Sequence, residues 1–116
     1  MEDILDKLDK ILEERKSSNS KDSYIAALYK KGNNHICDKV IEEANELVAA
    51  TRESENQIIH ESADLLFHVL VLLASHDIKY ARILEELENR FGTSGIEEKN
   101  NRKWWGNKML SGISPW

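Results

Sequence analysis

Neither glycine nor proline occurs between Asn33 and Phe91, and neither occurs before Gly32. These are the two residue types that most strongly interrupt helices. The uninterrupted stretches are rich in Leu, Ile, Ala, Glu and Lys, which favour helix over strand. The sequence therefore predicts an all-α fold.

Apolar spacing and capping residues divide the chain into expected helices. The first covers residues 2–15, and the second is capped by Asp22 or Ser23 and closed by Gly32. Further helices are expected at 35–52, 55–75, 80–91 and 96–103. We expect one helical domain over residues 1–103 and an irregular, Trp-rich tail over 104–116.

The links between these helices are short, so successive helices are expected to pack antiparallel as a bundle. From Leu65 to Ala74 the chain is apolar on every helical face, and only His68 interrupts it. Such a helix is normally buried on all sides. A chain of 116 residues has too little material to surround it, so we expect a homodimer that completes the bundle.

Composition excludes several classes of protein. The chain has 16 basic and 21 acidic residues, a net charge of −5, which argues against a nucleic-acid partner. Cys37 is the only cysteine, so neither an intrachain disulfide nor a Cys/His zinc cluster is expected. The apolar stretch that ends at Ser75 is shorter than the roughly 20 residues of a membrane span. We therefore expect a cytoplasmic protein with no membrane partner.

Several carboxylates occupy positions where an apolar residue is expected. Glu43 falls on the stripe formed by Ile36, Val40, Leu47 and Val48. Glu46 lies one turn further along this helix, and Glu42 lies beside them. On the next helix Glu61 and Asp64 are three residues apart, and His68 continues their line.

Clustered, buried carboxylates are unfavourable unless something compensates their charge. A hard divalent cation such as Mg²⁺, with Mn²⁺ as an alternative, provides this compensation through oxygen ligands. Taken alone, an acidic doublet is typical of a solvated helix face. The second acidic pair in apolar surroundings favours a metal site that handles nucleotide phosphates. A di-iron bundle is excluded because no histidine has a glutamate three residues before it.

The acidic pattern E-E-x-x-E followed by E-x-x-D resembles the all-α nucleoside triphosphate pyrophosphatase (MazG-like) superfamily. Within it, the chain is most similar to the phosphoribosyl-ATP pyrophosphatase family of histidine biosynthesis. The resemblance runs from about Asp3 to Arg102, and the matching segments are Ser23-Tyr24, Lys31-Gly32, Ile36 to Glu46, His60 to Leu73, and Gly92 to Arg102.

The resemblance implies a reaction in which phosphoribosyl-ATP and water give phosphoribosyl-AMP and pyrophosphate, with Mg²⁺ as cofactor. It implies that a metal-activated water attacks the α–β phosphoanhydride. By position it implies four metal ligands and one further carboxylate, Glu42, which is a weaker ligand or a base that orients water. The ligands are Glu43, Glu46, Glu61 and Asp64. The alternatives are a house-cleaning (d)NTP pyrophosphatase of the same superfamily and a non-catalytic helical dimerisation module.

Three basic residues are candidates for binding substrate phosphates. Lys39 lies one turn before Glu43, and Lys99 and Arg102 share a face of the expected last helix. A solvated side chain explains Lys39 equally well, and it explains Lys99 and Arg102 slightly better because the tail around them is generally basic. We expect His68 to be a hydrogen-bonded core histidine rather than a ligand, and Tyr24 to contact either the substrate or the core.

Overall fold

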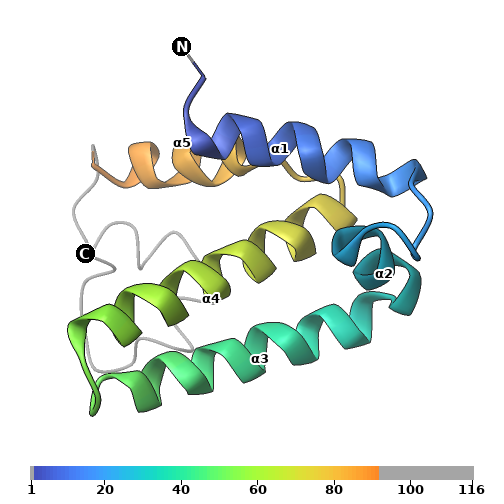
Figure 1. The fold of residues 1–116 in the computed structure, drawn as a ribbon. Coiled ribbons are helices and arrows are strands. Elements are labelled where there is room, and N and C mark those ends of the chain that lie inside the picture. Colours follow the sequence, from blue (N-terminus) through green and yellow to red (C-terminus); the bar gives the residue numbers. More distant parts are fainter. Residues whose placement is uncertain (1, 92–116) are drawn as a thin grey trace. The chain divides into compact units, whose positions relative to one another are not determined.

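The computed structural model describes residues 2–91 and contains helices without any strand in that range. The elements are α1 (Ile4–Glu14), the 3-10 turn η1 (Arg15–Ser17), α2 (Tyr24–Lys31), α3 (Asn33–Ala50), α4 (Glu55–Ser75) and α5 (Tyr80–Phe91) (Figure 1). The predicted all-α class is confirmed. The expected helix at 96–103, the tail at 104–116 and the boundary between them lie outside the described residues.

Capping residues set the helix boundaries much as the sequence predicts. The Ser23 hydroxyl accepts a hydrogen bond from the Ala26 N–H at the start of α2, and the Ser54 hydroxyl accepts one from Gln57 at the start of α4. The third helix begins at Asn33, two residues before the predicted start at residue 35, and no side chain caps it. Gly32, at φ +94°, ends α2 and is also the residue immediately before α3, so the two helices share it.

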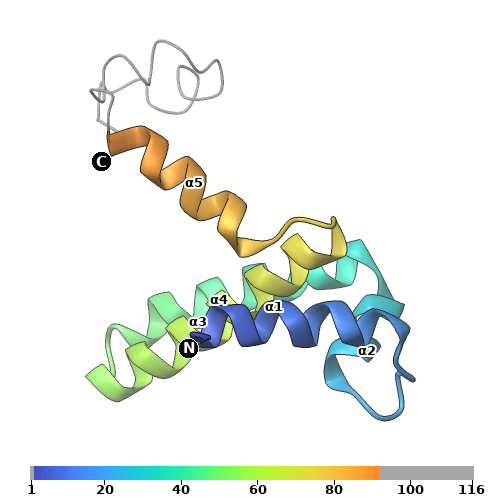
Figure 2. The same cartoon turned by 90° about the horizontal axis from the view of Figure 1, so that it is seen from above.

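Helices α3 and α4 form an antiparallel hairpin, and this is the most extensive helix pair within the first 80 residues (Figure 1). Helix α1 contacts α4, and α2 contacts α3 (Figure 2). The predicted antiparallel packing is confirmed for the α3–α4 pair. The hairpin matters for function because it brings the two acidic motifs face to face.

The buried core lies at the end of the hairpin where α3 begins and α4 ends. Its centre consists of Leu12, Leu28, Ile36, Leu70 and Val71. The predicted apolar stripe of α3 is wrong at its end. Val48 is 66% exposed, whereas Ala50 is buried.

Helix α4 is only partly buried within one chain. His68, Leu70 and Val71 are buried, whereas Leu66 is 50% exposed and Ile59 is 61% exposed. By length and composition α4 is also able to cross a membrane, but the core helix of a soluble protein passes the same test. Ile59 and Leu66 therefore give α4 an exposed apolar surface in the part of the chain that the structure describes.

The chain divides after Tyr80 into two compact units, residues 1–80 and residues 81–116. In the second unit, α5 carries an ion pair between Arg82 and Glu85, 3.2 Å apart and one turn apart on the helix. The acidic motifs, Lys39 and the core all belong to the first unit. The candidate site is thus contained within the α3–α4 hairpin.

Candidate metal centre

Three carboxylates from the two hairpin helices meet in one place. Glu43 and Glu46 come from α3 and Glu61 comes from α4, and one oxygen of each lies within 4.8 Å of the others. Antiparallel packing produces this arrangement, because the last part of α3 faces the first part of α4. The structure therefore brings together three of the four predicted ligands as one group.

The described residues do not compensate all of the buried negative charge of this group. Glu43 is 7% exposed, and the Oε2 atoms of Glu43 and Glu61 are both buried without a hydrogen-bond partner among residues 2–91. A buried polar oxygen without a partner is costly, and a charged one is more so. Burial raises the pKa of the Glu61 carboxyl, and the neighbouring Glu46 raises it further through a shared hydrogen bond and its negative charge.

These observations fit a hard cation. The donors of this group are all carboxylate oxygens, the ligand type that Mg²⁺ prefers. A bound cation would partner the two orphaned oxygens and reverse the pKa shift of Glu61. Glu43, Glu46 and Glu61 are accordingly the residues that could hold a metal ion.

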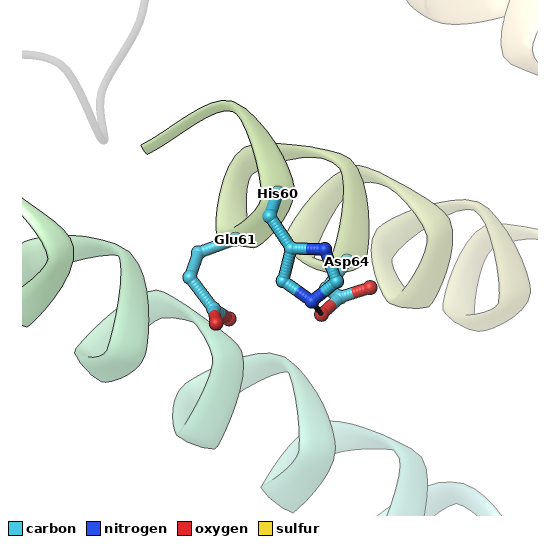
Figure 3. A group of neighbouring side chains, drawn as sticks. All are labelled: His60, Glu61 and Asp64. Atoms are coloured by element: carbon cyan, nitrogen blue, oxygen red, sulfur yellow. Dashed lines mark ion pairs between the residues drawn. The ribbon is translucent and has the colours of Figure 1, made fainter. Parts of the chain in front are cut away.

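A second group overlaps the first through Glu61 and includes Asp64. Its third member is His60, whose Nε2 lies 3.3 Å from the Asp64 carboxylate. Figure 3 shows the Glu61 side chain extending toward α3, while the His60 ring lies against Asp64. Asp64 is therefore grouped with a histidine rather than with Glu43 and Glu46.

Sequence reasoning missed His60 as a candidate. The available signal was its position four residues before Asp64 and next to Glu61, which places it on the same helical face as Asp64.

Lys39 and Glu42 form an ion pair at the edge of the cluster. The Lys39 Nζ is 2.8 Å from Glu42 Oε2 and 4.0 Å from Glu43 Oε1. The hydrogen bond with Glu42 raises the pKa of Lys39, and the same bond lowers the pKa of Glu42. In the described part of the chain, Glu42 belongs to neither of the two groups that could hold a metal ion. Its part in metal binding therefore stays a prediction.

The remaining predicted phosphate contacts, Lys99 and Arg102, lie outside the described residues. Beside the cluster is an open cavity of about 280 Å³. It is lined by Glu46, Ala49, Ala50, Glu53, Gln57 and Glu61. The carboxylates of Glu46 and Glu61 therefore border a space that solvent and small molecules can enter.

His68 is buried, at 6% exposure, and both of its ring nitrogens have hydrogen-bond partners. Nδ1 lies 2.8 Å from the Asp64 backbone oxygen, and Nε2 lies 3.0 Å from the Tyr24 hydroxyl. The expected hydrogen-bonded core histidine is what the structure contains. Asp64 orients this ring through its backbone carbonyl.

Comparison with known proteins assigns the family. A family model for phosphoribosyl-ATP pyrophosphohydrolase matches residues 5–91, which include both carboxylate groups. The chain is 50% identical to the phosphoribosyl-ATP pyrophosphatase of Vesicomyosocius okutanii over 103 residues, which is 88% of this chain and 98% of the relative. The corresponding protein of Ruthia magnifica is 48% identical over the same shares of both chains.

A further relative is the histidine biosynthesis bifunctional protein HisIE of Helicobacter hepaticus. It is 50% identical over 101 residues, which is 86% of this chain and 44% of the relative. The family match and the 98% coverage of the first two relatives agree with the all-helical fold and the acidic hairpin. The chain belongs to the phosphoribosyl-ATP pyrophosphohydrolase family.

Proposed function

We propose that this protein hydrolyses phosphoribosyl-ATP to phosphoribosyl-AMP and pyrophosphate, the second step of histidine biosynthesis. Family membership and the names of the relatives support the substrate. The single observation that carries the chemistry is the Glu43–Glu46–Glu61 cluster with its two orphaned, buried oxygens.

The cofactor in this proposal is Mg²⁺, for which Mn²⁺ could substitute. Glu43, Glu46 and Glu61 would hold it. Asp64, three residues after Glu61 on α4, is proposed as the fourth ligand on the basis of the sequence resemblance. A bound divalent cation supplies an activated water and neutralises the charge of the leaving pyrophosphate.

The protein's own residues then bind and orient the reactants. Lys39 offers its ammonium group to the phosphates at the edge of the cluster. Glu42 is a carboxylate at neutral pH, and the hydrogen bond from Lys39 lowers its pKa further, so it can accept a hydrogen bond from the attacking water. Water attack on the α–β phosphoanhydride releases pyrophosphate. Lys99 and Arg102 are proposed as additional phosphate contacts.

The same proposal includes a cytoplasmic homodimer that binds a small nucleotide and neither nucleic acid nor membrane. Each hairpin helix has two exposed apolar side chains seven residues apart on its outer surface. They are Ile41 and Val48 on α3, and Ile59 and Leu66 on α4, all at least 50% exposed. A second copy of the chain would remove these side chains from water.

Pyrophosphate release from phosphoribosyl-ATP and from a panel of dNTPs, with Mg²⁺ and with EDTA, tests the activity. We expect turnover of phosphoribosyl-ATP in Mg²⁺ and none in EDTA. Preferential turnover of a dNTP would instead favour the house-cleaning enzyme. Absence of turnover, with a melting temperature that does not rise with Mg²⁺, would favour the dimerisation module.

A further inference from the structure

Tyr24 combines an exposed side chain with a hydroxyl that is firmly held. The residue is 55% exposed, yet its hydroxyl lies 3.0 Å from Nε2 of the buried His68. We infer that Tyr24 contacts a ribose hydroxyl of the substrate, and that His68 is a positioning residue that holds the Tyr24 hydroxyl for this contact. The inference rests on the proposed function and assigns the part of the nucleotide that Tyr24 recognises.

The hydrogen bonds of His68 determine the direction of the contact with Tyr24. The Asp64 backbone oxygen can only accept, so the Nδ1 atom 2.8 Å away must carry a proton. In the neutral imidazole, Nε2 is then an acceptor and the Tyr24 hydroxyl must donate to it. The lone pairs of the phenol oxygen remain available to accept a hydrogen bond.

Ring packing and helix capping hold Tyr24 in place. Its ring stacks on Phe67 with centroids 6.3 Å apart, and the Phe67 ring meets His68 edge-on at 5.1 Å. Tyr24 is the first residue of α2, and the Ser23 cap fixes the start of that helix. An exposed phenol that is oriented by a buried histidine and an aromatic ring is suited to positioning a bound molecule.

The location of Tyr24 indicates which part of a nucleotide it meets. The Tyr24 hydroxyl lies 3.0 Å from His68 Nε2, and His68 Nδ1 lies 2.8 Å from the backbone oxygen of Asp64, which belongs to the second group with His60 and Glu61. Lys39 would bind phosphate in the proposed function, and the sugar is the group attached to the α-phosphate. A ribose hydroxyl can donate to the phenol oxygen, whereas a phosphate oxygen cannot.

Two variants and their combination test this assignment. Tyr24→Phe removes only the hydroxyl, and His68→Leu removes the side chain that orients it. We expect each to lower kcat/KM about fivefold to tenfold, the loss of one hydrogen bond to a neutral group. The double variant should be no worse than either single variant, because both remove the same contact. His68→Gln, which retains a hydrogen-bonding group, should recover part of the loss.

Substrate analogues make the test specific to the sugar. The analogues lack the 2′ or the 3′ hydroxyl of the ribose that is attached to the α-phosphate. Wild type should turn over one of them about fivefold to tenfold less efficiently than the full substrate, and Tyr24→Phe should turn over the analogue and the full substrate equally well. The Mg²⁺ concentration that half-protects each variant against heat should match wild type, because the carboxylate cluster is unchanged. In ¹⁵N spectra of the metal-free protein at neutral pH, His68 should be the Nδ1–H tautomer.

Each outcome decides the inference. Wild-type kinetics in Tyr24→Phe, undiminished discrimination between the analogues, or additive losses in the double variant would overturn it. If His68→Leu fails to fold, Tyr24→Phe with the analogues still decides, since its ring packing is intact. A wild type that hydrolyses no nucleotide at all would overturn the proposed function itself, and the sugar contact with it.

Discussion

At the scale of single residues, Glu43 shows most clearly how a side chain that serves function can lower stability. Its side chain lies on the buried stripe of α3, and one of its oxygens has no hydrogen-bond partner within the described part of the chain. Core residues are normally selected for packing, and a carboxylate here weakens the metal-free protein. Its retention is understandable if a cation satisfies the oxygen in the working enzyme.

The first prediction follows for Glu43→Gln and Asp64→Asn, which preserve side-chain volume and remove one charge. Each should lower kcat by more than roughly a hundredfold, because a metal ligand is lost. The helical circular dichroism should be retained, and Glu43→Gln should raise the melting temperature of the metal-free protein. Glu14→Gln, an exposed change on α1, is the matched control. Wild-type turnover in either test variant would remove that residue from the ligand set.

The second prediction concerns Tyr80, whose hydroxyl donates to the Asp6 carboxylate. This bond raises the pKa of Tyr80 from 10.0 to about 12. Between these pH values the unfolded phenol ionises while the folded one keeps its proton, so stability is lost as the pH rises through the window. The tyrosinate absorbance of wild type minus that of Tyr80→Phe should titrate near pH 12. A midpoint near pH 10 would show that the Tyr80–Asp6 bond does not form.

At the scale of elements, local capping chemistry explains most helix boundaries. The range 55–75 predicted for the fourth helix agrees with α4, because Ser54 supplies the hydroxyl that begins it. At the other end, Asp77 has φ +59°, and the Ile78 N–H bonds back to the Leu73 carbonyl. This is the geometry of a Schellman motif, which ends a helix without a glycine here.

The third prediction tests the cap at the start of α4, less than two turns before Glu61. Ser54→Ala leaves the Gln57 N–H without its partner and should cost about 1 kcal/mol of unfolding free energy. Chemical denaturation measures the loss. Ser54→Asp retains an oxygen acceptor and should behave like wild type. Equal stability of the alanine variant and wild type would mean that the cap contributes nothing to the hairpin.

At the scale of the whole molecule, substitutions on α4 can separate an effect on dimer assembly from an effect on folding. Leu66 is 50% exposed and Leu70 is 5% exposed in a single chain. A charge at Leu66 therefore faces water in a monomer and would be buried only in a dimer. A charge at Leu70 is buried in either case, which makes the two positions a matched pair.

The fourth prediction uses this pair. Wild type should be a dimer at micromolar concentration, and Leu66→Glu should give a folded monomer, because a buried charge without a partner opposes association. Leu70→Glu should unfold the chain instead. Light scattering with circular dichroism distinguishes these results. A monomeric, active wild type would contradict the homodimer in the proposal.

Sequence alone was sufficient wherever the cause was local. The absence of helix breakers between Asn33 and Phe91, together with the caps Ser23 and Ser54, accounts for the fold class and most helix boundaries. The helical period of α3 was sufficient to place Glu43 among buried residues. These features depend on neighbours within a turn or two of the same helix.

The tertiary structure decided how the residues are partnered. The register of α3 against α4 places Glu61 with Glu43 and Glu46, and packing of α2 brings Tyr24 to His68. The pairs within a single helix, Glu42 with Lys39 and His60 with Asp64, follow instead from spacings of three and four residues. Spacing shows which residues share a helix face, whereas partners on different helices are set by the register and distance of the packed helices, which only the tertiary structure determines.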